Sequence, residues 1–446
     1  MKRIIVVLIY LILPTFASAE SSTTSEITMS AVDALKLAGA FVEREDFNSA
    51  EQILTKMPPL DNGVLEVERW FLMGRISAFR GDFDTAIKIY RRILDAQPNL
   101  ARVRFELAVC YTKLGQWWRA DYHLRLAMAG DDLPDEVKNI MNYFRYFVRQ
   151  NKNWNAWFSF GAAPDNNINS AAGGEECVMT IFGLMCRQLP EPERAIGYNF
   201  VLGGNYEFKL SDQWRWKSEG NIYTNAYDKS KYDDLYLSAS TGPRYVWKYG
   251  DVWLAGIAAR RWYGWEGYNW STGAKIDINY DFSRKLLGGL SLLASKNIYD
   301  NFSEYMDGET YGANARLTYY IDADMYIILR SGLDREITID LIYSNWRPSV
   351  GAGFGIELPA RFSVYFDTNF YWQDYDGQRW IVKDNSFSQV AEHNFTHRYA
   401  VSVSNSKFRV WDFAPMLTFS YTRRDSNIWQ REYDKWAIEF SMQQRF

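Results

Sequence analysis

The sequence predicts an α + β multidomain protein in which an all-α solenoid precedes a fourteen-stranded antiparallel transmembrane β-barrel. Three observations support this fold class. The hydrophobic period is helical from residue 31 to about residue 150 and changes to two after Trp154. The connections between the later segments alternate between short and long. The chain closes with YDKWAIEFSMQQRF, in which apolar and polar residues alternate as in a strand between two different environments.

The first twenty residues, MKRIIVVLIYLILPTFASAE, are typical of a secretory signal peptide. Two cations precede the apolar run from Ile4 to Leu13, and small residues precede Glu20. We therefore expect cleavage after Ala19, which removes residues 1–19 and leaves residues 20–30 as a linker. No later apolar run reaches the length of about 18 residues that a membrane-spanning helix requires.

Composition narrows the possible functions. Trp, Tyr and Phe make up 17% of the chain, yet its mean hydropathy is negative. This combination favours amphipathic strands with interfacial aromatic belts. Without the two cations of the signal peptide, 48 Lys and Arg remain against 54 Asp and Glu. Such mild acidity argues against a nucleic-acid partner.

Residues 31–150 contain a 34-residue repeat that matches the tetratricopeptide pattern. Small residues fall where paired helices cross, and large ones fill the space beside them. The best copy has Trp70, Met73, Gly74, Ala86, Tyr90 and Pro98 at the pattern positions, and the next has Leu107, Ala108, Tyr111, Ala120 and Leu124. A weaker copy runs through Leu37, Ala38, Phe41, Ala50 and Leu54. About three copies are the minimum that buries a continuous core.

Solenoids of this kind bind a protein partner on the concave face of their first helices. By position in the repeat, we expect that face to carry Phe71, Arg75, Phe79, Arg102, Phe105 and Lys113. An ordinary solvated face that includes phenylalanines is the alternative interpretation.

Fourteen strand-like segments follow the helical part. They lie near residues 154–161, 196–209, 213–226, 235–247, 251–263, 271–281, 286–298, 309–320, 324–334, 346–357, 361–374, 392–404, 409–423 and 433–446. Links of three or four residues alternate with longer ones such as Ala162–Ala195 and Tyr375–Ala391. An even strand number with turns at one end and loops at the other indicates a transmembrane barrel. A soluble propeller or sandwich would not predict this alternation.

Alternation along the strands assigns a lipid side and a lumen side. In RFSVYFDTNFYWQ the even-numbered residues are almost all apolar and most odd-numbered ones are polar. A bilayer core cannot satisfy charges, so the polar set must face the lumen. We expect lumen residues of both signs: Arg316, Arg361, Asp367, Lys435, Glu439 and Arg445. Fourteen strands should enclose a modest lumen, open or plugged.

Three glycines share the lumen side of one strand. In SVGAGFGIE these are Gly351, Gly353 and Gly355. A glycine stripe allows a sheet to bend sharply or another backbone to approach it. We interpret the stripe either as barrel curvature or as a surface for a passing or plugging chain.

Two cysteines are candidates for a disulfide. Cys177 and Cys186 enclose eight residues in CVMTIFGLMC, and an exported chain meets oxidising conditions, so we expect them to be bonded. Two free thiols are the alternative. The sequence contains no phosphate-binding loop, no zinc-ligand spacing and no nucleophile and base set. We therefore expect no catalytic residues, no cofactor and no metal.

A signal peptide, a few tetratricopeptide repeats and a barrel of about fourteen strands together resemble the surface lipoprotein assembly modulator (Slam) family, the type eleven secretion outer-membrane proteins. The resemblance implies a periplasmic repeat domain at 31–150 and an outer-membrane barrel at 154–446, with long loops outside the cell. It also implies a translocon that moves client proteins to the surface. Family clients are surface lipoproteins or secreted small β-barrel proteins, often capturing haem or iron from a host.

The resemblance also implies partners. We expect outer-membrane lipid, the client protein, periplasmic chaperones and the barrel assembly machinery, for which Phe446 resembles the C-terminal recognition signal. Two other functions remain open. One is an exopolysaccharide export porin, and the other is a surface adhesin or host-colonisation factor whose long loops bind a ligand.

Overall fold

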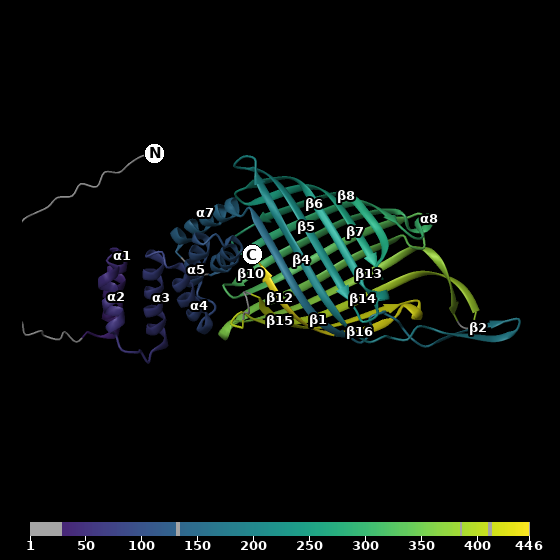
Figure 1. Ribbon diagram of the computed structural model, residues 1–446, viewed down its shortest axis with the longest axis horizontal. Helices are drawn as coiled ribbons and strands as arrows, with labels where there is room; N and C mark the ends of the chain where they lie inside the picture. The colour runs from purple at the N-terminus through teal and green to yellow at the C-terminus, as the bar shows by residue number, and fades with distance from the viewer. Residues whose placement is uncertain (1–28, 131–133, 384–385, 409–412, 446) are drawn as a thin grey trace, which may run out of the picture. The chain divides into compact units, whose positions relative to one another are not determined.

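The structure is a computed structural model that describes residues 29–130, 134–383, 386–408 and 413–445 (Figure 1). The predicted signal peptide, most of the predicted linker and Phe446 lie outside these residues. The chain divides into two compact units, with the boundary between Glu66 and Val67. Across the described ranges, none of the helices is both long enough and apolar enough to cross a membrane.

Seven helices of the described chain precede the first strand. They are α1 (Ala31–Glu43), α2 (Phe47–Lys56), α3 (Gly63–Phe79), α4 (Phe83–Ala96), α5 (Ala101–Lys113), α6 (Trp117–Ala129) and α7 (Asp135–Asn151). Gly81 and Gly115 occupy the turns before α4 and α6 with φ of +83° and +70°, a backbone conformation that glycine adopts without strain. The side chain of Asp82 then caps α4 by accepting the Thr85 N–H at 3.1 Å.

The predicted repeat positions form the helical core of the second unit. Ala86, Tyr90, Leu107, Ala108, Ala120 and Leu124 are all fully buried. Gly74 faces the Tyr90 ring so closely that a Cβ atom there would lie 2.5 Å from Cε1 of Tyr90. The small residues of the repeat thus allow two helices to cross closely, and the large ones fill the space beside the crossing.

Fourteen antiparallel strands close into a barrel, in which β1 pairs with both β4 and β16. The barrel strands are β1 (Trp154–Asp165), β4 (Ala195–Lys209), β5 (Trp214–Ala226), β6 (Asp234–Trp247), β7 (Gly250–Tyr263), β8 (Glu266–Asp281), β9 (Leu286–Tyr299), β10 (Gly308–Asp322), β11 (Met325–Thr338), β12 (Asn345–Leu358), β13 (Phe362–Lys383), β14 (Ser386–Asn405), β15 (Ala414–Ser426) and β16 (Tyr433–Arg445). A separate hairpin, β2 (Glu175–Thr180) and β3 (Gly183–Gln188), lies in the connection between β1 and β4. A short helix, α8 (Ser303–Met306), and the 3-10 turns η1 (Ser230–Tyr232), η2 (Pro359–Arg361) and η3 (Trp429–Arg431) lie in other connections.

The fourteen predicted strands are confirmed, but two connections differ from the prediction. Tyr375–Ala391 is not a loop, because β13 and β14 continue through it as a paired hairpin after a register shift between Asp374 and Gln378. The connection from β7 to β8 is only Gly264 and Trp265, because β8 begins earlier than predicted. Strands pair through their backbone groups, so they can continue beyond the apolar belt without alternating apolar and polar residues. The prediction relies on that alternation and therefore misses these extensions.

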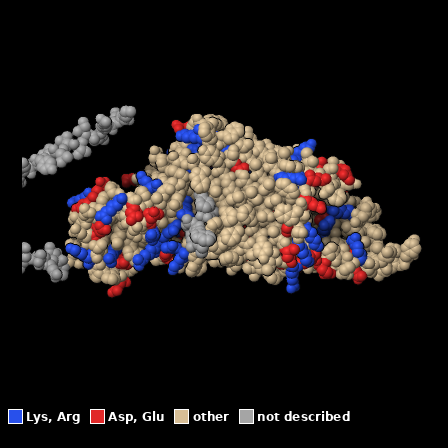
Figure 2. Space-filling model, in the orientation of Figure 1, with Lys and Arg blue, Asp and Glu red and all other residues tan. Residues whose placement is uncertain are grey.

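The two sides of the barrel wall are as predicted. Along β16, Trp436, Ile438 and Phe440 are exposed on the outside, whereas Lys435 and Glu439 alternate with them and point inward. Figure 2 shows a broad outer belt that is largely free of charged residues, with Lys, Arg, Asp and Glu concentrated beyond it. Such an apolar belt requires a hydrocarbon environment, so the barrel spans a membrane.

The crossing at Gly74 yields the first prediction. Replacing Gly74→Ala places a methyl group against the Tyr90 ring and should destabilise the helical part by about 1–3 kcal/mol, the usual cost of overpacking. Gly63→Ala in the same helix is the matched control, because a Cβ atom there would have no other atom within 4 Å and alanine favours helix. The measurement is the temperature at which helices of the full chain become protease-sensitive. An unchanged temperature for Gly74→Ala would contradict the close crossing.

Candidate functional site

The barrel encloses a cavity of about 1110 Å³ whose lining combines strand residues with residues of α6 and α7. Its charged lining comprises ten Lys or Arg and six Asp or Glu: Asp121, Arg125, Arg145, Arg149, Lys152, Glu207, Lys217, Arg244, Asp251, Asp277, Asp281, Arg316, Arg330, Asp334, Arg347 and Arg424. The lumen therefore contains both signs, with cations in excess. Because α6 and α7 contribute to the lining, helices limit the lumen at the end where the short turns lie.

A buried ion pair joins the helices to this end of the barrel. Arg104 of α5 is 0% exposed, and its Nη2 lies 2.6 Å from Oε2 of Glu357, near the end of β12. The Arg104 Nε donates to the Pro98 carbonyl at 2.8 Å. The hydroxyl of Tyr122 in α6 donates to the other oxygen of Glu357. Burial, reinforced by the Glu357 charge, raises the pKa of Tyr122 well above its usual value, so the phenol keeps the proton that it donates.

A second pair involves the turn between β12 and β13. Arg361 donates to both carboxylate oxygens of Asp95 in α4, with Nη2 2.8 Å from Oδ2. The prediction that Arg361 lies on the lumen wall is therefore wrong. Arg361 ends the turn η2 with φ of +65°, so the alternation of β13 does not extend to it. Its fork-like guanidinium instead recognises a helix carboxylate.

A third cluster holds α7. Asp281 at the end of β8 accepts from Arg149 at 2.6 Å and from Arg145 at 3.0 Å, two arginines one helical turn apart. Arg215 of β5 donates to the carbonyl of Gln150 at 2.7 Å. Burial lowers the pKa of Arg145 to about 10, which still leaves it charged at neutral pH.

We call these three clusters the helix–barrel latch: Arg104–Glu357 with Tyr122, Asp95–Arg361, and Arg145 and Arg149 with Asp281. All of them join helices α4–α7 to strand ends or turns far away in the sequence. Removing one partner of a buried pair leaves an uncompensated charge, which costs roughly 3–5 kcal/mol. The latch therefore makes the closed arrangement specific, because that arrangement tolerates loss of a buried partner poorly.

The glycine stripe leaves room for aromatic side chains, and barrel curvature stays a prediction. Gly351 lines the cavity, but a Cβ atom at Gly353 would meet the Tyr365 hydroxyl, and one at Gly355 would meet the Tyr326 ring. Rings from neighbouring strands thus fill the space that the missing side chains leave. Among the described residues, this wall is covered from within and offers no bare backbone to a passing chain at Gly353 and Gly355.

The other predicted lumen residues are placed as follows. Arg316 lines the cavity, and Asp367 pairs with Arg330, which also lines it. Lys435 pairs with Asp165 at the end of β1 at 3.1 Å. Glu439 points inward, and for Arg445 the structure describes the backbone alone.

The predicted concave face is only partly exposed. The prediction that Phe71 is open to a partner is wrong: it is 2% exposed, packs 6.1 Å from Tyr90 and is covered by the Arg102 guanidinium. Phe105 is also half-buried, edge-on to Phe144 of α7. Both rings pack against rings of other helices, so neither is fully open to solvent.

The remaining members of that set are polar or peripheral. Arg75 and Arg102 flank Glu106, whose pKa is raised by burial against the opposing effect of the two cations. Phe79 and Lys113 are exposed near the ends of α3 and α5. Client binding at these residues stays a prediction.

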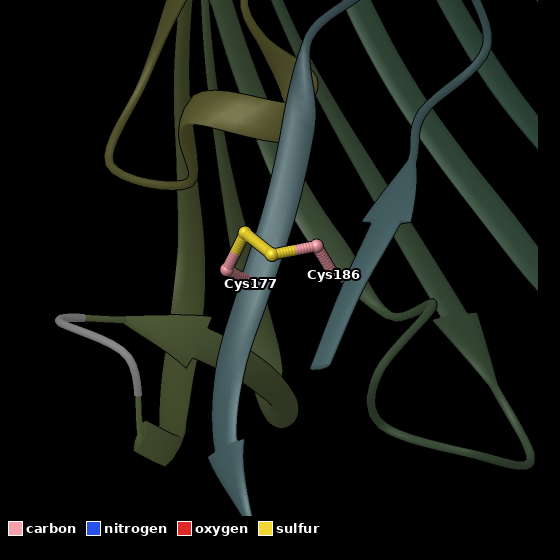
Figure 3. The surroundings of a disulfide bond; sticks show 2 residues. All are labelled: Cys177 and Cys186. Atoms are coloured by element: carbon pink, nitrogen blue, oxygen red, sulfur yellow. A yellow bond between two sulfur atoms is a disulfide. The ribbon is translucent and has the colours of Figure 1, made fainter. Parts of the chain in front are cut away.

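The two cysteines are joined in the hairpin. Cys177 of β2 and Cys186 of β3 are directly paired and bonded, as Figure 3 shows. Within the described ranges, the one cluster of metal-type ligands is Glu175 with these two sulfurs, which the disulfide already occupies.

A known protein family matches this closed barrel. The family model of the surface lipoprotein assembly modifier matches residues 154–446. The chain belongs to this family. The match covers the barrel from its first strand onward, and the family and the barrel place the protein in the outer membrane of a Gram-negative cell.

Individual relatives extend the similarity into the helices. The chain is 24% identical over 383 residues to surface lipoprotein assembly modifier 1 of Haemophilus influenzae, covering 82% of this chain and 75% of that one. It is 22% identical over 439 residues to the modifier of Moraxella catarrhalis, covering 95% and 84%. A solved bacterial polysaccharide outer membrane secretin is 13% identical, with a TM-score of 0.34 over 65% of this chain and 98% of that chain.

The latch yields the second prediction. Glu357→Gln removes the carboxylate that pairs with the buried Arg104, so the closed state should lose up to roughly 3–5 kcal/mol relative to an open one in which water reaches Arg104. The purified full chain in a planar lipid bilayer should then show larger or more frequent conductance steps. Asp212→Asn is the matched control, because the Lys209–Asp212 pair at the same end is largely exposed and is expected to contribute little. Equal conductance of all three proteins would contradict the latch.

Proposed function

We propose that this chain is an outer-membrane translocon that transfers client lipoproteins from the periplasm to the cell surface. Membership of the surface lipoprotein assembly modifier family is the observation that carries the proposal. In this arrangement the helices and short turns face the periplasm, and the longer connections face outward. Clients with a small β-barrel, including haem- or iron-capturing lipoproteins, are the proposed cargo.

The size of the lumen limits how a client could pass. A cavity of about 1110 Å³ is comparable to a small-molecule pocket and far smaller than a folded domain. Passage through the barrel therefore requires an extended client and an open latch. One partner of each latch pair belongs to the helices that receive the client in this proposal, so client binding to α4–α7 is coupled to opening.

The mixed lumen favours a polypeptide over a uniformly charged polymer. Carboxylates and guanidinium groups are paired along the wall, as at Arg244 with Glu207 and Asp251. A lumen of one dominant charge would instead suit an anionic polysaccharide. The exposed Phe79, Arg102 and Lys113 are the candidates for client contact on the solenoid.

No energy source other than the client itself is proposed. The sequence has no nucleotide-binding loop, so client folding outside the cell, or insertion of its lipid into the outer leaflet, would drive transfer. Periplasmic chaperones would deliver the client unfolded, and the barrel assembly machinery would insert the translocon itself.

A reversible lock tests the proposal. Asp95→Cys with Arg361→Cys, joined by a cleavable thiol cross-linker in intact cells, should hold the latch shut and abolish surface display of a dependent lipoprotein. Cleaving the cross-linker should restore display. Each single cysteine variant treated alike is the control and should display normally.

The proposal fails if the doubly cross-linked cells display the lipoprotein at the normal rate. It also fails if deleting the gene changes the surface exposure of no lipoprotein, as measured by protease accessibility on whole cells.

A further inference from the structure

The hairpin β2–β3 lies outside the barrel wall, and passage of a chain through the barrel does not by itself require it. Its strands pair only with each other in the described chain. Figure 1 shows β2 beyond the ends of the barrel strands, at the end of the longer connections. The hairpin is inserted between β1 and β4, next to the seam at which β1 meets β16.

The hairpin exposes an unusual amount of apolar surface. Ile181 and Phe182 at its tip are 94% and 86% exposed. Met179 and Leu184 are exposed on one face, and Met185 is exposed on the other. Outside a membrane, contiguous exposed apolar side chains of this kind mark an interaction site. Methionine adapts to partners of varied shape.

The hairpin is held in shape without a core of its own. Isolated two-stranded hairpins are only marginally stable in water. Here the Cys177–Cys186 disulfide joins the strands, and Arg187 bridges to Glu176 at 2.8 Å. Gln430 from the connection before β16 donates to Glu176 at 2.8 Å and fixes the base. A surface ordered in advance loses less entropy when a partner binds.

One edge of the hairpin is open. β2 lies alongside β13 and β14, whereas no described strand pairs with the outer edge of β3. The Leu189 N–H donates to the Gly174 carbonyl at 2.9 Å, which sets the hydrogen-bonded pairs of the ladder. By that alternation, Leu184, Cys186 and Gln188 direct their backbone groups outward. β3 contains no lysine or proline, and its one charged residue, Arg187, pairs with Glu176 on the neighbouring strand.

We infer that the open edge of β3 and the apolar tip receive an extended segment of the client with alternating apolar side chains, which adds as a third strand. The inference rests on the proposed function and names where the client first binds outside. A β-rich client leaving the barrel has unpaired strands until its own sheet closes. An apolar edge supplies backbone hydrogen bonds and side-chain contacts to such a segment.

Two other occupants fit the observations less well. A lipid surface would have to reach beyond the charged residues that lie past the apolar belt, where the hairpin projects (Figures 1 and 2). A second copy of this chain could pair edge to edge through β3. Nothing in the acidic base formed by Glu175 and Glu176 favours contact with an identical acidic base.

Matched variants separate the edge from the side chains. Gln188→Pro removes an outward N–H and leaves the paired positions Glu176–Arg187 and Val178–Met185 intact. Gln188→Ala loses the same side chain but keeps the N–H. Ile181→Asp combined with Phe182→Asp removes the apolar tip. The shift in gel mobility on reduction shows whether each variant still forms the disulfide.

The probes are fluorescent synthetic peptides that copy the β-strands of one surface lipoprotein whose display depends on this gene. Their affinity for the full chain in detergent micelles is measured by anisotropy. We expect at least one peptide to bind the wild type and Gln188→Ala alike, and to bind Gln188→Pro and the tip variant roughly tenfold more weakly.

Equal affinity for all four proteins, or no binding to the wild type, overturns the inference. The proposed function still stands in that case if surface display of a lipoprotein depends on this gene. Binding of lipopolysaccharide vesicles in place of peptide, or a β3-dependent dimer with unaltered peptide affinity, also overturns it. If no lipoprotein depends on the gene, the proposed function fails and the inference fails with it.

Discussion

The exclusion of charge from hydrocarbon is the constraint on which the rest of the structure depends. The barrel has an outer belt largely free of charge, so its charged residues gather in the lumen and at the two ends. Charges confined to a narrow, partly dry lumen need partners. Many find them on neighbouring strands, but Glu357 and Asp281 at the short-turn end find arginines on helices. The helices thereby supply the positive charges that balance these two barrel carboxylates.

This arrangement makes the closed state specific without making it irreversible. Desolvating an arginine and a carboxylate costs several kcal/mol, which their attraction offsets only when the geometry is good. If water reaches both partners together, as on opening of the whole latch, much of that cost is recovered. Loss of a single partner has no such compensation. A barrel closed by paired charges can therefore open as a unit while it resists partial opening.

The strands can be predicted from the sequence because lipid imposes a strict alternation on them. Trp436, Ile438 and Phe440 signal a strand and its orientation at once. The repeat positions are also predictable, since Gly74 and Tyr90 are constrained by one helix crossing. The errors fall where these constraints end. Arg361 follows a turn with positive φ, and β13 and β14 continue where no lipid pattern marks them.

The latch pairs cannot be predicted from the local sequence around their residues. Arg104 and Glu357 are 253 positions apart, and each resembles any charged residue at a helix or strand end. From repeat position alone, Phe71 is expected to face a partner. The position in the repeat does not reveal that the Arg102 side chain covers the ring. The lumen glycines are similarly ambiguous, because the rings that fill the space beside them come from the neighbouring strands β11 and β13. Such contacts between distant segments become visible only in the folded chain.

In the proposed function, passage of a client requires α4 to separate from the turn after β12, and this movement can be measured directly. Spin labels at Ala96 of α4 and Lys407 in the turn after β14, both exposed, report the distance between the helices and the short-turn end of the barrel. We expect one narrow distance distribution for the resting protein and a longer, broader one when a client is arrested in transit. An unchanged distribution in the arrested complex would contradict the opening of the latch.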